Sequence, residues 1–77
     1  MNKQDLFKII SEALEVDSVD ENSSMDNLDE WDSLGHLSIL SAIDQELDGK
    51  ASKLSALAGA TSVSSIIIIL EENNLMQ

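Results

Sequence analysis

The residues with the clearest capacity for chemistry gather around Ser33, where an acidic loop meets an apolar periodic run. A serine at a helix start commonly caps the helix, because its hydroxyl accepts a hydrogen bond from a first-turn N–H. The same position favours an attached phosphodiester, because unpaired N–H groups and the helix dipole stabilise negative charge there. A serine hydroxyl is a poor nucleophile at neutral pH and needs a base and a polarised phosphate. Any modification of Ser33 therefore depends largely on another protein.

The run that follows Ser33 has the spacing of an amphipathic helix. Apolar residues recur every three or four positions, which predicts a helix over 33–48 whose buried face is made of Leu37, Ile39, Leu40, Ile43 and Leu47. The expected exposed side carries Ser38, Ser41, Ala42 and Gln45. Gly49 can take the positive φ that commonly ends a helix.

Three further helices are predicted. The first spans 3–15, has Asn2 as its cap and buries one face made of Leu6, Phe7, Ile9, Ile10, Ala13 and Leu14. A short helix is expected over 52–58, and a last one over 62–73, capped by Thr61 or Ser62. The β-branched run 66–69 could also form a strand, but no other stretch alternates to pair with it. On that helix one apolar face is made of Val63, Ile66, Ile67 and Leu70, whereas Ile68 falls off this face and is expected to be partly exposed.

The segment 16–32 is a long polar loop with a few spaced apolar residues that are expected to pin it across the helices: Val16, Val19, Met25, Leu28 and Trp31. Trp31 is interpreted as an anchor packed on the helices, since a tryptophan buries a large apolar area. The acids of the loop do not fit a calcium-binding loop. Counting from Asp17, the third position is Val19 and no glycine occupies the turn.

Composition bounds the class of protein. A chain of 77 residues makes one domain, 1–77, with a simple core, because it buries only about 60% of its unfolded surface. The absence of proline favours helices, which proline would interrupt. Only two residues are aromatic, which indicates a core of packed helices rich in Leu, Ile and Val. No cysteine is present, which excludes disulfides, a thiolate nucleophile and cysteine-based zinc sites. The sequence lacks a signal-peptide pattern and a membrane-length apolar run, so the cytoplasm is the expected location.

The formal net charge of −11 argues against nucleic acid and anionic membrane as partners, since both demand a cationic surface. It favours basic patches on partner proteins, which would speed encounter. The acidity could equally serve only to keep a small domain soluble.

The motif Asp32-Ser33-Leu34, at a loop-to-helix junction in a small acidic chain, resembles the acyl carrier protein family over roughly Lys3 to Leu75. The resemblance implies an all-α, four-helix bundle with three longer helices, a short third helix and a long first loop. It implies that a phosphopantetheinyl transferase attaches 4'-phosphopantetheine from coenzyme A to Ser33, flanked by Asp32 and Leu34. It also implies that Asp32 helps to orient the metal held by the transferase.

The resemblance further implies a non-catalytic, monomeric carrier with no metal site of its own. The thiol of the arm would hold an acyl or aminoacyl group as a thioester, between enzymes with basic docking patches. His36, one turn beyond Ser33, either lies beside the arm or packs and bonds to a nearby loop; the spacing implies no catalytic triad. In the family, the short third helix borders a pocket for the acyl chain. The small residues Ala56, Ala58, Gly59 and Ala60 could leave such room or could equally reflect close packing.

One feature departs from the fatty-acid-synthase members of the family, which carry acids along the exposed face of the helix after the modified serine. Here the acids precede the helix or lie in its last turns, and the middle is small and neutral. This distribution indicates a specialised pathway. Two alternatives stay open: a peptidyl or aminoacyl carrier of the same fold, and an acidic helical adaptor that is never modified. A small enzyme is poorly supported, because with one histidine and no cysteine the chain has few side chains suited to catalysis.

Overall fold

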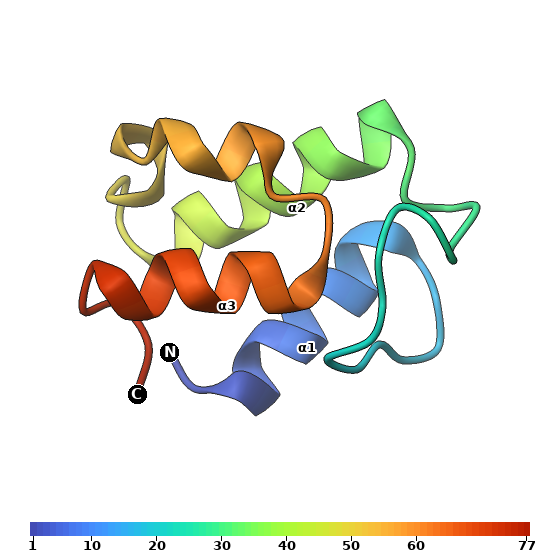
Figure 1. The fold of residues 1–77 in the computed structure, drawn as a ribbon, viewed down its shortest axis with the longest axis horizontal. Coiled ribbons are helices and arrows are strands. Elements are labelled where there is room, and N and C mark those ends of the chain that lie inside the picture. Colours follow the sequence, from blue (N-terminus) through green and yellow to red (C-terminus); the bar gives the residue numbers. More distant parts are fainter.

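The computed structural model describes residues 1–77 and is all-helical (Figure 1). Three α-helices, α1 (Lys3–Leu14), α2 (Ser33–Glu46) and α3 (Val63–Glu72), are joined by a long loop and by two short 3₁₀ turns, η1 (Ala51–Lys53) and η2 (Ser55–Gly59). Helix α1 lies against α2, η1 contacts α2, and η2 contacts α3. The prediction of an all-α fold is confirmed. No helix has the length and apolar character that crossing a membrane requires.

Helix α1 begins as predicted. The Asn2 side chain accepts from the Asp5 N–H at 2.8 Å, and the Asp5 carboxylate accepts from the Asn2 N–H at 3.3 Å. Such a reciprocal cap satisfies two backbone donors that a helix start leaves unpaired. The helix ends at Leu14, because Glu15 adopts a left-handed conformation with φ 57°.

Helix α2 ends at Glu46, two residues before the predicted end. Asp48 and Gly49 both have positive φ, 55° and 86°, and the Gly49 N–H donates to the Asp44 carbonyl oxygen at 2.9 Å. The buried side chains of this helix are His36, Ile39 and Ile43. The prediction that Leu37 is buried is wrong, since it is 62% exposed. His36 takes the inner position of the first turn, and the next residue is rotated about 100° away from it.

The short helix predicted over 52–58 is present as two 3₁₀ turns, η1 and η2, and not as one continuous helix. Their backbone bonds join residues three apart, as in Leu54 N–H to the Ala51 carbonyl oxygen at 2.9 Å and Leu57 N–H to the Leu54 carbonyl oxygen at 3.0 Å. Leu54, between the turns, has φ −100° and ψ 84° and interrupts them. A segment this short gains little from helix propagation. The Ser52 side chain also competes with backbone donors for a carbonyl group, since its hydroxyl donates to the Gly49 carbonyl oxygen at 2.8 Å.

Helix α3 contains the isoleucine run, so the helical interpretation of that run is correct. The Ser62 hydroxyl caps the helix by accepting from the Ser65 N–H at 3.1 Å. The predicted apolar face is buried and consists of Val63, Ile66, Ile67 and Leu70. Ile68 is 54% exposed, as expected from its position off that face.

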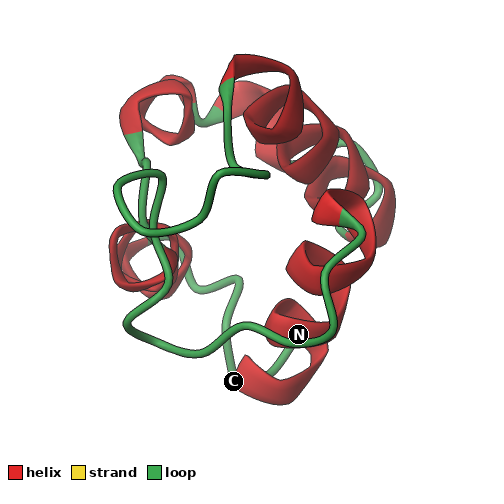
Figure 2. Cartoon of the chain, turned by 90° about the vertical axis from the view of Figure 1, so that its right-hand side faces the viewer, coloured by secondary structure: helices red, strands yellow, loops and turns green.

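The loop between α1 and α2 crosses one end of the bundle (Figure 2). Val19 and Trp31 are buried beneath it, and the other three predicted apolar pins are partly buried. Two backbone bonds tie the loop to the start of α3: Met25 N–H to the Thr61 carbonyl oxygen at 2.9 Å, and Val63 N–H to the Ser23 carbonyl oxygen at 3.0 Å. The loop is thereby fixed at its middle and at the end that enters α2.

Candidate functional site

Asp32, not Ser33, caps helix α2. Its carboxylate accepts from the Gly35 N–H at 2.8 Å, and its backbone is extended, with φ −100° and ψ −168°. Ser33 is consequently the first helical residue, and its exposed hydroxyl makes no hydrogen bond to the rest of the protein. The sequence left open whether Ser33 caps the helix or offers its hydroxyl for modification, and in the structure the capping role belongs to Asp32. The cap is a carboxylate, and the hydroxyl is accessible from solvent.

Gly35 lets the acidic loop approach the first turn of α2. A Cβ at this position would collide with the backbone carbonyl oxygen of Glu30 and would come within 2.9 Å of the Leu14 Cδ2 atom. The glycine is therefore required by close packing, since only a residue without a Cβ fits between helix α2 and the turn that leads into it. This contact fixes the position of Ser33 relative to α1.

Gly35→Ala is expected to lower the free energy of unfolding by about 1–3 kcal/mol, as overpacking against backbone does. Alanine would otherwise favour the helix by about 1 kcal/mol. Gly59→Ala is the matched control, because its Cβ would meet nothing within 4 Å and its φ is not positive. Urea unfolding of both variants checks the prediction. An equal or higher stability of Gly35→Ala would show that the turn adjusts freely.

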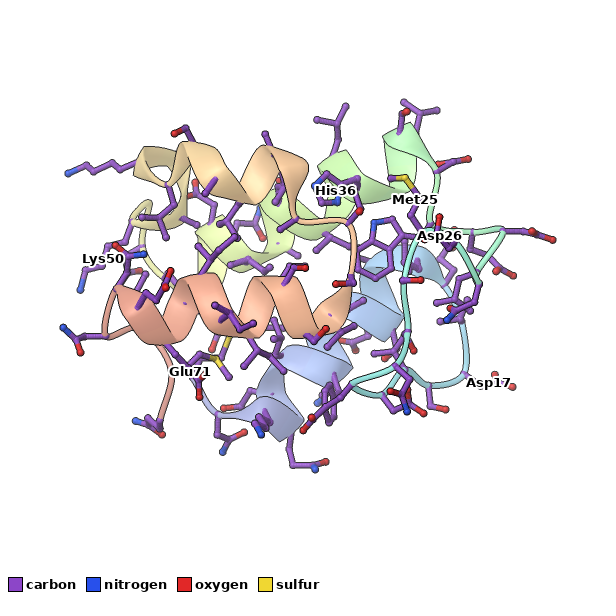
Figure 3. All side chains as sticks on the ribbon, in the orientation of Figure 1. Asp17, Met25, Asp26, His36, Lys50 and Glu71 are labelled. Carbon is purple, nitrogen blue, oxygen red and sulfur yellow. The ribbon has the colours of Figure 1, made fainter.

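His36 lies inside the protein, between α2 and the turns before α3 (Figure 3). The Trp31 Nε1–H donates to its Nδ1 at 3.1 Å, and its Nε2 lies 3.0 Å from the Leu57 carbonyl oxygen. An indole N–H can only donate and a carbonyl can only accept, so Nδ1 is the acceptor of this ring and Nε2–H is its donor to Leu57. His36, a residue of α2, thus bonds to both the loop and η2. This is the second of the two roles considered for it, in which it packs and bonds within the protein. A role beside a prosthetic arm stays a prediction.

Trp31 is the loop anchor that the sequence predicts. Its side chain is 1% exposed, and its only polar atom is satisfied by His36. A buried tryptophan with its N–H paired gains the full benefit of its apolar area. The residue therefore holds the end of the loop, and with it Asp32 and Ser33, against the core.

The surroundings of Ser33 are strongly acidic. Asp29, Glu30 and Asp32 are exposed beside it, and no lysine lies between Lys8 and Lys50. Lys50 follows the opposite end of α2 from His36 (Figure 3). The positive end of the α2 dipole favours an anion at Ser33, whereas the three carboxylates oppose it. A partner that reaches this site is therefore favoured by basic side chains of its own.

An apolar surface, which we call the leucine face, lies beside Ser33. Leu34 and Leu37 are 75% and 62% exposed. They border a shallow hollow on the outer side of α2 whose other residues are Ala13, Ser38, Ser41, Ala42 and Gln45. The hollow contains no charged side chain. Two large exposed leucines beside an uncharged hollow form a candidate surface for contact with another protein.

A second hollow, which we call the α2 groove, lies between α2 and the turns η1 and η2. It has a volume of about 320 Å³ and is lined by Leu40, Ser41, Asp44, Ala51, Ser52, Leu54, Ser55, Leu57 and Ala58. Of the small residues predicted to leave room here, Ala58 lines the groove, whereas Ala60 is buried in the core and Ala56 is exposed. Sequence reasoning missed Asp44, although its position eleven residues after Ser33 places both on one side of the helix.

No three His, Cys, Asp or Glu residues lie close enough together to hold a metal ion. The chain matches no protein-family model, no curated protein and no solved structure. What the protein does is therefore inferred from its own residues. The exposed and unbonded Ser33 hydroxyl, at the start of α2, is the group that offers a chemical function.

Proposed function

We propose that this chain is a carrier protein in which the Ser33 hydroxyl is esterified by 4'-phosphopantetheine. One observation carries the proposal. Asp32 caps the helix, which leaves the Ser33 hydroxyl exposed and without a partner inside the protein. The Asp-Ser-Leu motif that suggested the carrier family lies at the helix start, where a phosphodiester is electrostatically favoured.

The modification is a phosphoryl-group transfer from coenzyme A. The Ser33 Oγ forms a bond to the phosphorus nearest the pantetheine, the pyrophosphate P–O bond breaks, and adenosine 3',5'-bisphosphate leaves. The serine proton passes to a base. That base is assigned to a phosphopantetheinyl transferase, because both nitrogens of His36, the only histidine, are engaged. The exposed Asp32 carboxylate keeps one oxygen outside the cap and can help to orient the metal of that enzyme.

When bound, the arm supplies a thiol that holds an acyl or aminoacyl group as a thioester. The bundle would carry that group between enzymes without catalysing a reaction itself, as a monomer. We interpret the fold as a variant of the acyl-carrier bundle in which two 3₁₀ turns replace the short third helix. The flexible arm raises the effective concentration of the cargo at each enzyme in turn.

The proposal is tested by intact mass after incubation with coenzyme A, magnesium and a broad-specificity phosphopantetheinyl transferase. We expect the gain of one phosphopantetheine per chain. A known carrier protein labelled in parallel shows that the enzyme is active, and circular dichroism shows that the chain is folded. A folded chain that stays unmodified, both here and with a transferase from its own source, would contradict the proposal and leave the acidic adaptor as the better interpretation.

Leu37→Gln is expected to lower the specificity constant of the transferase by about tenfold. Covering an exposed leucine contributes on the order of 1.4 kcal/mol, which is one factor of ten. Ile68→Gln is the matched control: it removes the large exposed apolar side chain that lies outside the leucine face, 54% exposed and on α3. Glutamine is a good helix former, so both helices persist. Equal rates for the parent and both variants would exclude the leucine face from docking.

A further inference from the structure

The α2 groove lies on the same side of the helix as Ser33. Counting from Ser33, Leu37, Leu40 and Asp44 follow at four, seven and eleven positions, which places all four in one stripe along α2. Leu40 and Asp44 line the groove. Asp44 is about 16 Å from Ser33 along the axis, at about 1.5 Å per residue. An extended pantetheine chain is longer than this, so its end can reach the groove by following the stripe.

The groove has an apolar floor and one charged wall. Ala51 and Leu57 are buried at its base, and Leu40 and Leu54 are partly buried. Three serines contribute hydroxyl groups, and Asp44 contributes the only charge. A volume of about 320 Å³ is at the small end of ligand pockets, which suits a short cargo. A purely aliphatic chain would leave the carboxylate of Asp44 without a counterpart.

Only one oxygen of Asp44 is needed by the fold. Its Oδ1 accepts from the Ser52 N–H at 2.8 Å and so attaches η1 to α2. Its Oδ2 makes no hydrogen bond within the protein and is open to solvent, because no buried side-chain oxygen or nitrogen lacks a partner. The basic residue nearest in sequence, Lys50, is exposed and forms no ion pair. The groove therefore contains a carboxylate oxygen that can pair with a cationic group of a ligand.

We propose that the α2 groove selects a short cargo that ends in a cationic amine, an ω-aminoacyl thioester on the Ser33 arm. The hydrocarbon part of the cargo packs on Leu40, Leu54 and Leu57, and the ammonium group pairs with Asp44. This inference rests on the carrier function proposed above. It distinguishes the aminoacyl from the plain acyl form of that function.

The experiment compares two cargoes that differ in one atom group. The parent, Asp44→Asn and Asp48→Asn are each loaded from β-alanyl- or butyryl-coenzyme A, which place an ammonium or a methyl group at the same position. Asparagine keeps the oxygen that accepts from Ser52, so only the charge of Asp44 is lost. Asp48→Asn removes a charge from an exposed residue outside the groove and tolerates the positive φ there. The half-life of each thioester is followed by intact mass.

The measured quantity is the β-alanyl half-life divided by the butyryl half-life on the same protein, which cancels effects common to both cargoes. We expect Asp44→Asn to lower this ratio about two- to fivefold, the range of a solvent-accessible ion pair, and Asp48→Asn to leave it unchanged. The amide signal of Ser52 should shift with β-alanyl but not with butyryl cargo.

An equal ratio in the parent and Asp44→Asn, or an equal fall in Asp48→Asn, would overturn the cargo inference while the loaded carrier stands. A Ser33 that takes no arm from either thioester, on folded protein and with active transferase, would overturn the carrier function and this inference together. The mass gain on loading therefore separates the two failures.

Discussion

Ser33→Ala is expected to abolish the mass gain that coenzyme A and a phosphopantetheinyl transferase produce on the parent chain. The variant removes the oxygen atom that the proposed transfer would esterify. Its free energy of unfolding should stay within about 0.5 kcal/mol of the parent, because the Ser33 hydroxyl makes no hydrogen bond and Asp32 supplies the cap. Loss of modification with unchanged stability would show that the variant lacks the acceptor oxygen and is not merely unfolded. Circular dichroism and urea unfolding check the second part.

Ser38→Ala is the matched control for this experiment. Ser38 is also exposed on α2, and its change to alanine keeps both leucines of the leucine face. It lies beyond the first turn, away from the helix dipole end and from Asp32. We expect full modification of this variant. Labelling of Ser33→Ala to the parent level would mean that another serine is the acceptor, and unlabelled Ser38→Ala would mean that the helix surface, not Ser33 alone, determines recognition.

The sequence was sufficient for the features that depend on local pattern. Spacing of apolar residues placed all three α-helices to within two residues at each end, and residue type identified Asn2 as one cap and narrowed another to Thr61 or Ser62, of which Ser62 is the cap. The isoleucine run could be assigned to a helix because nothing else in the chain could pair with it as a strand. The loop anchor Trp31 was predictable from its size alone.

The remaining features depend on contacts between distant segments. Leu37 follows the helical spacing of a core residue, but His36 points into the core because Trp31 and Leu57, from two other segments, supply its bonding partners. The 52–58 segment has helical residues, yet it forms two 3₁₀ turns, and the first of them is attached to α2 by the Asp44 carboxylate, which accepts from the Ser52 N–H. No local pattern predicts either partner. The groove and its charged wall therefore became visible only in three dimensions.

Trp31→Ala is expected to lower the free energy of unfolding by about 3–5 kcal/mol, the usual cost of deleting a large aromatic residue from a core. A 77-residue domain has a total of about 4–12 kcal/mol, so this variant should be close to unfolded. Trp31→Phe should cost about 1–3 kcal/mol, because it keeps an aromatic ring but leaves the buried Nδ1 of His36 without a donor. Urea unfolding followed by circular dichroism measures both, since no tryptophan fluorescence remains.

The coupling between Trp31 and His36, which share a hydrogen bond and stacked rings, can be separated from their packing on the rest of the core by combining Trp31→Phe with His36→Ala. If the bond joins the two side chains as a unit, the double variant should lose about 1 kcal/mol less than the sum of the single losses. Additivity within about 0.5 kcal/mol would instead assign both losses to packing. The distinction matters for the proposed function, because His36 also binds the Leu57 carbonyl oxygen, and Leu57 forms part of the groove floor. The same unit that holds Ser33 in place would then also hold the groove in which we propose that the cargo lies.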